Sequence, residues 1–373
     1  MSRVYLDHNA TTPPRPQVVA AMVEALRACG NPSSPHSFGR AARKTVEDGR
    51  ARVATLVGAE AETVVFTGGG TEANALALAG AGRILVSAVE HDSVFGAVDG
   101  AEAIPVDARG VIDLAALEAM LAGEGRGEGR GRGRTLVALM LANNETGVLQ
   151  PVAEAARLTH GRGALLHCDG TQAAGRIPVD MARLGADTLS LSAHKMGGPQ
   201  GVGALVTAPH VTLVPQLRGG GQERRRRAGT ENVPGIAGFA VAADLASRSL
   251  GRMGTLAGWR DRLEREIGTM APVRFFGREA LRLPNTSCFA LEGVASEVQV
   301  MALDLAGVAV GAGAACSSGK TEPSRVLRAM GVEDGTSRCA IRVSLGWNSR
   351  AGDVDVFLAA WGAVTARRSL LPQ

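Results

Sequence analysis

The chain has 373 residues, 45% hydrophobic and 3% aromatic, with a formal net charge of +4, and a chain of this length forms one large domain or two smaller ones. The mild charge and the few aromatic side chains argue against a nucleic-acid-binding protein, and five scattered cysteines without CxxC or Cys/His spacing argue against a disulfide framework or a structural metal site. The sequence holds no apolar run of membrane-spanning length and begins without the apolar core of a signal peptide, so we expect a cytoplasmic protein with no membrane partner.

Short apolar runs alternate with helical stretches over the first two-thirds of the chain. The predicted strands are 63–67, 83–88, 135–141, 164–168, 187–191 and 202–206. The predicted helices are 15–28, 38–57, 71–80, 113–122 and 151–160. Several strands are apolar throughout, which is typical of a sheet covered on both faces. The alternation predicts an α/β fold with a mainly parallel sheet covered by helices.

The pattern changes after about residue 250. We expect a helix at 253–270, a strand at 286–291, a helix at 296–306 and a last helix near 353–366. We therefore predict a large domain over residues 15–250 and a smaller α+β C-terminal domain over 251–373, which residues 1–14 join. The Gly-Arg tract at 123–134 is interpreted as a surface insertion, with RNA contact as the alternative.

Four loops that follow predicted strands carry unusual polar residues. In an open parallel sheet such loops meet at the carboxyl edge, where ligands bind. In FTGGGTEANALALA, Thr71 opens a helix whose N-terminus can hold an anion, although an ordinary turn and helix cap explains this segment equally well. His91, in SAVEHDSV, follows a predicted strand as a capping or a solvated side chain, and LANNETG places paired asparagines at another strand end.

The segment LSLSAHKMGGPQG leaves a buried strand and at once presents His194, Lys195 and glycines. A solvated lysine in a surface turn is the plainer interpretation, and a lysine that forms a Schiff base is the sharper one. Asp169 ends the apolar run ALLHC, where a carboxylate needs a cation nearby. A lysine amine, a buried aspartate and a phosphate-holding helix N-terminus together match the requirements of pyridoxal phosphate.

The motifs, taken in this order, resemble those of the cysteine desulfurases of the iron–sulfur cluster and nitrogen-fixation type, which are class-V aminotransferases and fold type I pyridoxal-phosphate enzymes. The resemblance covers nearly the whole chain and rests on YLDHNATTPP, GNPSSPHSFGRAAR, VVFTGGGTEANALAL, NNETGVLQP, HCDGTQAAGRIPVD, LSAHKMGGPQGVGAL, GGGQERRRRAGTENV, GAGAACSSGKTEPSRVLRAMG and IRVSLG. It implies conversion of L-cysteine to L-alanine, with the sulfur passed as a persulfide to an acceptor or scaffold protein for iron–sulfur cluster or other sulfur-cofactor biosynthesis.

The resemblance also implies roles for individual residues. Lys195 would bind the cofactor, Asp169 would pair with its pyridinium nitrogen, and His91 would stack on the ring and move protons. Further cofactor contacts would come from Gly70, Thr71, Asn144, Gln172, Ser192, His194 and, across the interface of a homodimer, Thr230. The substrate would be bound by Asn31, Asn144 and Arg342, whose guanidinium suits a bidentate grip on its carboxylate.

Cys316, in GVAVGAGAACSSGKTEPSRVL, is the candidate nucleophile. Its glycine and serine neighbours predict an exposed loop before a helix that begins near Glu322, although an isolated cysteine in an Ala-rich turn is usually packed. The resemblance makes Cys316 the persulfide carrier and a candidate transient iron–sulfur ligand, with no other metal site expected. The remaining cysteines, interpreted as structural, are Cys29, Cys168, Cys288 and Cys339.

Other functions stay open at this stage. A class-V aminotransferase or a selenocysteine lyase would not require Cys316. A nucleic-acid-binding protein would use the arginines at 224–227 and the Gly-Arg tract, and a sulfur-relay subunit would keep the fold without the activity. The chain departs from the family pattern in the Gly-Arg tract and in the GGGT phosphate loop. It also ends at Gln373, soon after the last helix, and this departure leaves docking to a cluster scaffold open.

Overall fold

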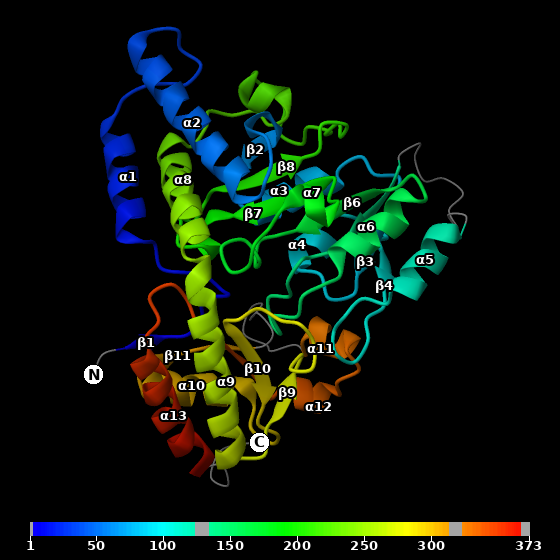
Figure 1. Ribbon diagram of the computed structural model, residues 1–373, viewed down its shortest axis with the longest axis vertical. Coiled ribbons are helices and arrows are strands. Elements are labelled where there is room, and N and C mark those ends of the chain that lie inside the picture. The colour runs from blue at the N-terminus through cyan, green and yellow to red at the C-terminus, as the bar shows by residue number, and fades with distance from the viewer. Residues whose placement is uncertain (1–2, 124–133, 313–322, 367–373) are drawn as a thin grey trace.

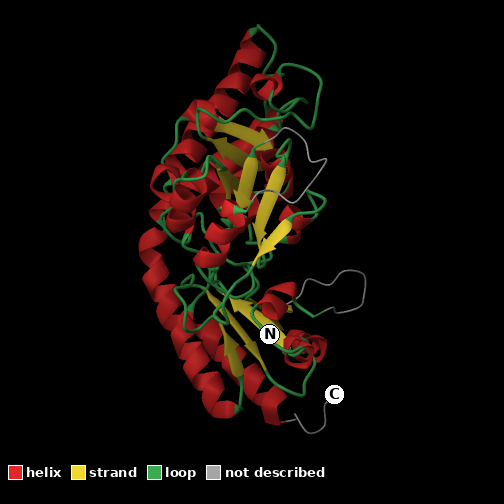
Figure 2. Ribbon diagram, turned by 90° about the vertical axis from the view of Figure 1, so that its right-hand side faces the viewer, coloured by secondary structure: helices red, strands yellow, loops and turns green. Residues whose placement is uncertain are grey.

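The computed structural model describes residues 3–123, 134–312 and 323–366, which form two lobes with a sheet in each (Figure 1). Figure 2 shows the two sheets in separate lobes, with helices packed along them. Within the described residues, the larger lobe contains a seven-stranded sheet, and the smaller lobe contains a four-stranded sheet and a two-stranded one. Cys316 and residues 124–133 of the Gly-Arg tract lie outside the described residues.

The large sheet has the strand order β2-β8-β7-β6-β5-β3-β4. Its strands are β2 (Val64–Thr67), β3 (Arg83–Ser87), β4 (Glu102–Ile104), β5 (Thr135–Ala138), β6 (Leu165–Asp169), β7 (Thr188–Ser192) and β8 (Gly203–Thr207). Only β8 runs against its neighbours, and the other adjacent pairs are parallel. The predicted α/β fold with a mainly parallel sheet is therefore confirmed.

Helices cover both faces of the large sheet. Side chains alternate between the two faces along each strand, so an apolar strand gives both faces apolar side chains that must be covered. Val64 and Phe66 of β2 belong to the core on one face, and Val65 packs with residues of the third helix on the other. The helices are α1 (Pro16–Arg27), α2 (Ser37–Leu56), α3 (Gly70–Leu78), α4 (Asp92–Phe95), α5 (Leu114–Ala122), α6 (Val152–His160), α7 (Met181–Leu184) and α8 (Val233–Arg248). Short 3₁₀ turns are η1 (Ala61–Thr63), η2 (Ala193–Lys195), η3 (Gln222–Arg225) and η4 (Leu250–Arg252).

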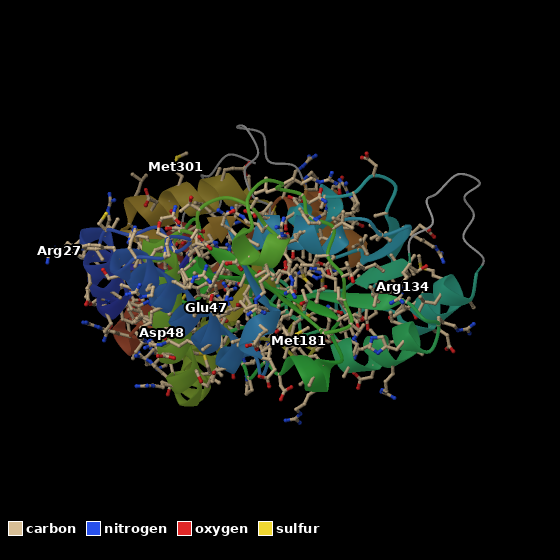
Figure 3. The ribbon with its side chains drawn as sticks, turned by 90° about the horizontal axis from the view of Figure 1, so that it is seen from above. Arg27, Glu47, Asp48, Arg134, Met181 and Met301 are labelled. Atoms are coloured by element: carbon tan, nitrogen blue, oxygen red, sulfur yellow. The ribbon has the colours of Figure 1, made fainter. Side chains whose placement is uncertain are left out.

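Helix α2 is amphipathic and packs closely on α8. Glu47 and Asp48 project from its outer side in Figure 3, while Val46 and Val53 are buried. A Cβ added at Gly49 would lie 2.6 Å from Cγ2 of Ile236 on α8, so the close approach of the two helices requires glycine at this position.

The small lobe contains an antiparallel sheet with the strand order β12-β13-β10-β9. Its elements are α9 (Met253–Met270), β9 (Arg274–Phe276), β10 (Thr286–Ala290), α10 (Ser296–Leu305), β11 (Val308–Ala309), β12 (Gly311–Ala312), α11 (Arg325–Ala329), α12 (Asp334–Ser337), β13 (Ala340–Ser344) and α13 (Ala351–Ala366). The N-terminal strand β1 (Val4–Tyr5) pairs with β11. Leu263 of α9, Phe289 of β10 and Trp361 of α13 meet in one buried core.

Two local expectations need correction. The helix expected near Glu322 begins at Arg325, because Pro323 precedes Ser324, whose Oγ caps the helix by accepting the Leu327 N–H. The strand expected over 135–141 ends at Ala138. Helix α8 had no counterpart among the predicted elements, since its alanine-rich sequence is buried on several sides and gives only a weak amphipathic pattern.

A buried ion pair anchors the arginine-rich turn that follows the large sheet. Arg50 of α2 donates from Nη1 and Nη2 to the Glu223 carboxylate at 2.7 and 2.9 Å, and Glu223 Oε2 also accepts the Phe66 N–H. Glu223, Arg224 and Arg225 have φ angles of 45°, 54° and 64°, a left-handed conformation that costs about 1 kcal/mol for each non-glycine residue. The pair therefore offsets strain in this turn.

We expect Glu223→Ala to destabilise the protein by about 3 kcal/mol, because it leaves the Arg50 guanidinium buried without its partner. The measurement is urea denaturation of the purified variant. Arg52→Ala is the matched control, since the Arg52–Asp244 pair is exposed and its loss should cost under about 1 kcal/mol. Equal losses in the two variants would contradict the anchoring role of Glu223.

Candidate active site

A cavity of about 340 Å³ lies at the carboxyl edge of the large sheet, where ligands bind in open parallel sheets. Its volume falls within the range of small-molecule sites. The predicted site residues that line it are Gly70, Thr71, His91, Asn144, Asp169, Gln172, Ser192, His194, Lys195 and Arg342. The segments at the ends of five strands of the large sheet (β2, β3, β5, β6 and β7), together with β13 of the small lobe, therefore converge on one cavity.

Lys195 lies in η2, directly after β7, and its amine contacts backbone carbonyl groups of the N-terminal segment. Lys195 Nζ donates to the carbonyl oxygens of Asn9 and Ala10 at 2.6 and 2.7 Å. Burial, followed by the positive charges of Arg176 and Arg342, lowers the pKa of this amine from 10.5 to about 7. A large share of the amine is therefore neutral, and nucleophilic, near neutral pH.

Asp169 is the last residue of β6 and is buried, with 7% of its surface exposed. Its Oδ2 accepts from Asn74 Nδ2 at 2.9 Å, and its Oδ1 accepts the Thr171 N–H at 2.8 Å. Among the described residues no lysine, arginine or histidine forms an ion pair with this carboxylate. A carboxylate held this way on the cavity wall can receive a cationic group of a ligand.

A chain of hydrogen bonds connects Asp169 with His91. Asn74 of α3 donates to both Asp169 and Ser93 Oγ, each at 2.9 Å. Ser93 Oγ lies 2.9 Å from His91 Nδ1, which also accepts the Ser93 N–H. On its other side, Asn74 Oδ1 lies 3.0 Å from Nε2 of the buried His167. Asn74 thus holds Asp169 and links it with the histidine at the cavity mouth.

The N-terminus of α3 forms the end of the cavity that suits an anion. A Cβ added at Gly70 would lie 3.2 Å from Thr171 Oγ1 and 3.4 Å from Ser192 Cβ, so these side chains enclose the first turn of the helix closely. Thr171 Oγ1 is buried and has no hydrogen-bond partner in the described part of the chain. A ligand oxygen at this end would satisfy both that hydroxyl and the free N–H groups of the helix.

Arg342 of β13 reaches the cavity from the small lobe. Its Nη2 donates to Asp7 Oδ1 at 2.6 Å and its Nη1 to the Asn144 carbonyl at 3.0 Å. Its Nε is buried without a partner in the described part of the chain. The guanidinium is therefore held in place by two groups and keeps a donor for a further acceptor, such as a carboxylate. A Cβ at Gly311 would lie 2.8 Å from Arg342 Nη2, so only glycine leaves room there.

Two predicted residues lie outside the cavity wall. Asn31 is exposed, and its Oδ1 accepts the Ser33 N–H at 2.9 Å. Thr230 is also exposed, at the end of the arginine-rich turn. Neither belongs to the residues that line the cavity of this chain. Cys316 lies outside the described residues, and the structure gives no position for it.

The cavity wall includes residues to which the sequence analysis gave no role. Asn9 provides the carbonyl that accepts from Lys195, and Asn74 and Thr171 surround Asp169. All three lie inside segments that carried the family resemblance. Each of the three is a polar residue in a turn or near a helix start. From a single sequence, such a residue in a functional site cannot be distinguished from one that only caps a helix or stabilises a turn.

The comparisons with known proteins agree with this geometry. Residues 4–357 match the family model of the class-V aminotransferases. A cysteine desulfurase of Cereibacter sphaeroides is 44% identical and covers 96% of this chain and 94% of its own length. The structure of a NifS-like protein from Rickettsia africae has a TM-score of 0.89 at 33% identity, covering 97% of this chain and 99% of its own. SspA in complex with cysteine has a TM-score of 0.77 at 26% identity, covering 92% and 98%.

The two-lobed fold, with a lysine, a buried carboxylate and a helix N-terminus around one cavity, defines a pyridoxal-phosphate enzyme of fold type I. The chain belongs to the class-V aminotransferase family and, within it, to the cysteine desulfurases. The predicted family, activity type and cofactor are therefore confirmed. The residues present also fit that cofactor, because Asp169 lacks a cationic partner within the described residues and Thr171 Oγ1 lacks an acceptor.

A second buried carboxyl joins the two lobes beside the cavity. Glu145 Oε2 accepts from Ser324 Oγ, which caps α11, at 2.6 Å. Burial raises the pKa of the Glu145 carboxyl from 4.5 to about 7, although Ser324 and two arginines act in the opposite direction. Burial likewise raises the pKa of Glu90 to about 8, with the nearby Asp169 charge as a second cause.

We expect the protonated Glu145 carboxyl to favour the folded protein at acid pH, and this contribution to be lost as the pH rises through about 7. Between an unfolded pKa of 4.5 and a folded pKa of about 7, the folded protein holds a proton on Glu145 that the unfolded chain has released, so the contribution of Glu145 to stability falls with rising pH. Glu145→Gln cannot ionise and should remove about 3 kcal/mol of this dependence, while Glu90 keeps its own part.

Urea denaturation between about pH 5 and about pH 8 checks this expectation. Glu118→Gln is the control, because Glu118 is exposed on α5 and its replacement should leave the slope unchanged. An unchanged slope in Glu145→Gln would show that Glu145 is ionised in the folded protein throughout this range.

Proposed function

We propose that this chain removes the sulfur of L-cysteine, releases L-alanine and carries the sulfur as a persulfide on Cys316. The observation that carries the proposal is a buried Lys195 amine, its pKa lowered to about 7, in one cavity with Asp169, a carboxylate that has no cationic partner among the described residues. Two relatives support it: the cysteine desulfurase of Cereibacter sphaeroides, and SspA in its complex with cysteine. Neither an aminotransferase nor a selenocysteine lyase would need a persulfide on Cys316.

Each end of the cavity has a role toward pyridoxal phosphate. Lys195 would hold the aldehyde carbon, Asp169 the ring nitrogen, and Gly70, Thr71, Ser192 and His194 the phosphate. Gln172 and Asn144 would contact ring substituents, and His91 would lie over the ring. When bound, the group supplies a Schiff base for the substrate amine and a ring that stores the electron pair released from Cα.

The chain's own residues perform the remaining steps. Arg342 binds the substrate carboxylate through the Nε edge that Asp7 and Asn144 leave free. The neutral Lys195 amine takes the proton from Cα and is placed to return one. The Cys316 thiolate then attacks the substrate sulfur, so that an S–S bond forms and the Cβ–S bond breaks. The electron pair of that bond stays with the carbon fragment, and a proton completes the methyl group of alanine.

We propose that two copies of the chain form the enzyme. Thr230 is exposed and away from the cavity of its own chain, as expected of a residue that reaches a partner's phosphate site. Helix α1 exposes Val19, Val23 and Leu26 along one face, which supports a contact with a second copy. Asn31 would then complete the substrate site in the dimer.

Three further parts of the proposal concern the setting of the enzyme. The persulfide passes to an acceptor or cluster scaffold protein for iron–sulfur cluster or other sulfur-cofactor biosynthesis, in the cytoplasm. Within the described residues no helix is long and apolar enough to cross a membrane. Residues 15–250 and residues 251–373 with 1–14 act as the two domains, and the separate sheets of the two lobes support this division.

Lys195 should carry the cofactor as the only labelled lysine. Reduction of the loaded protein with borohydride, followed by peptide mapping, should place the pyridoxyl group on the peptide that contains SAHKMGG, because this amine is buried in the cavity and largely neutral. The chain offers its own controls, since Lys44 and Lys320 are its other lysines. Label on either of them would refute the assignment.

Cys316→Ala tests the proposed reaction itself. The variant should bind the cofactor and show the spectral change on adding L-cysteine, because those steps use Lys195 and the ring. Production of alanine and persulfide should fall by at least about 100-fold, since the attacking thiolate is gone. Cys29→Ala, which replaces an exposed cysteine on the surface, is the matched control. Alanine released at the wild-type rate by Cys316→Ala would instead favour a selenocysteine lyase or an aminotransferase.

A further inference from the structure

Arg176 is a buried arginine that lies directly behind Lys195, with 6% of its surface exposed. Its Nη1 donates to the carbonyl oxygen of Gln172 at 2.8 Å and also to Gln172 Oε1. Its Nη2 donates to the carbonyl oxygens of His8 and Lys195 at 3.0 and 3.4 Å. All of these acceptors are neutral, and no carboxylate forms an ion pair with Arg176 among the described residues.

An arginine in such a place is unusual, because a buried guanidinium is normally paired with a carboxylate. A neutral side chain could donate to the same carbonyl oxygens without the cost of burying a charge. The other two arginines that are buried among the described residues each contact a carboxylate, since Arg50 contacts Glu223 and Arg342 contacts Asp7. The positive charge of Arg176 therefore calls for a role beyond hydrogen bonding.

The first consequence of Arg176 is the orientation of Gln172. Because Oε1 of Gln172 accepts from Arg176, its Nε2 remains the donor, and it donates to the Asn9 carbonyl at 2.9 Å. The same carbonyl accepts from Lys195 Nζ at 2.6 Å. Arg176, Gln172, Asn9 and Lys195 are thus connected by hydrogen bonds, and the orientation of the Gln172 amide in the cavity wall is fixed.

The second consequence is electrostatic, and it depends on every charge that faces Lys195. Two cations, Arg176 and Arg342, oppose a proton on the amine, and two carboxylates, Asp169 and Asp7, favour one. The charge of Asp7 is already paired with Arg342 at 2.6 Å. Arg176 is therefore the cation near Lys195 that has no ion-pair partner among the described residues.

The neighbouring histidines add no compensating charge. Burial, followed by Lys195 and Arg176, lowers the pKa of His194 to about 4. Burial and Arg176 lower the pKa of His8 to about 3. Both rings are neutral at physiological pH, and His91 at the cavity mouth is exposed to solvent. Burial and Arg176 are also the two largest causes of the lowered pKa of Lys195.

We propose that Arg176 is a positioning residue for the cofactor lysine: its charge, unpaired among the described residues, favours the uncharged form of the Lys195 amine, and its hydrogen bonds fix the orientation of the Gln172 amide. This proposal rests on the proposed role of Lys195 toward an aldehyde. Addition of an amine to an aldehyde needs the free electron pair on nitrogen, so a protonated Lys195 could not capture the cofactor.

The test measures the ionisation of Lys195 directly in the cofactor-free protein. The protein is acetylated briefly with limiting acetic anhydride at a series of pH values, and the label on the Lys195 peptide is compared with that on the exposed Lys44. Only the neutral amine reacts, so the labelling of Lys195 should rise with pH with a midpoint of about 7 in the wild-type protein. The readout does not depend on Cys316 or on turnover, so it can fail or succeed independently of the proposed reaction.

Arg176→Gln keeps an amide donor but removes the charge, and it should raise the midpoint by at least about one pH unit. Arg176→Lys keeps the charge and should leave the midpoint close to that of the wild type. Arg157→Gln is the matched control, because Arg157 is exposed on α6. In parallel, cofactor capture by Arg176→Gln at neutral pH should slow at least about fivefold, as the neutral fraction of Lys195 falls.

Two results would overturn the proposal. A midpoint in Arg176→Gln equal to that of the wild type would show that the charge of Arg176 has no influence on Lys195. A wild-type midpoint close to that of a solvated lysine, about 10, would overturn it without any variant. The second measurement decides the question even if Arg176→Gln does not fold.

Discussion

The site depends on the parallel pairing of β6 with β7, which places a carboxylate and an amine at the same edge of one sheet. Asp169, the last residue of β6, lies beside Ser190 of β7. Strand β7 ends two residues later, at Ser192, so the chain leaves β7 at the same edge of the sheet as Asp169. Lys195 then follows within a single 3₁₀ turn. Asp169 is buried at this edge, so its charge needs a partner that enters the cavity.

The N-terminal segment and the small lobe complete what the sheet begins. Residues 7–10 enter from strand β1, which pairs with β11 of the small lobe, and their backbone carbonyls hold the Lys195 amine. Arg342 comes from β13 of the same lobe and pairs with Asp7. Arg342 and the backbone acceptors of the Lys195 amine therefore lie on the side of the small lobe, and Asp169 comes from the large lobe. Such a site forms only when both lobes are in place.

Much of this arrangement could be predicted from the sequence, because it lies in local patterns. The apolar runs before Asp169 and before Lys195 predicted two of the strands. The loops after parallel strands meet at the carboxyl edge of the sheet, so the sequence also predicted that these residues lie close together. The family motifs were recognisable for the same reason. The start of α11 was misplaced because Ser324 is the cap, and a cap is decided by a single hydrogen bond.

What the sequence did not predict depends on residues that are distant in the chain. Arg176 is an ordinary basic residue in GRIPVD until folding surrounds it with carbonyl oxygens of Gln172, His8 and Lys195. Glu145 acquires its raised pKa only because Ser324, from the other lobe, closes over it. Thr230 and Asn31 lie outside the cavity of their own chain, so no property of one chain alone assigns them a site.

The central claim is that Asp169 pairs with the protonated ring nitrogen of the cofactor that Lys195 holds. The most direct measurement is the ¹⁵N chemical shift of the ring nitrogen in protein loaded with ¹⁵N-labelled pyridoxal phosphate, compared between the wild type and Asp169→Asn. The account predicts the shift of a protonated pyridine in the wild type and of a neutral pyridine in Asp169→Asn, because a carboxylate stabilises the cation and an amide does not. A neutral ring nitrogen in the wild-type protein, or the same protonated shift in both proteins, would contradict it.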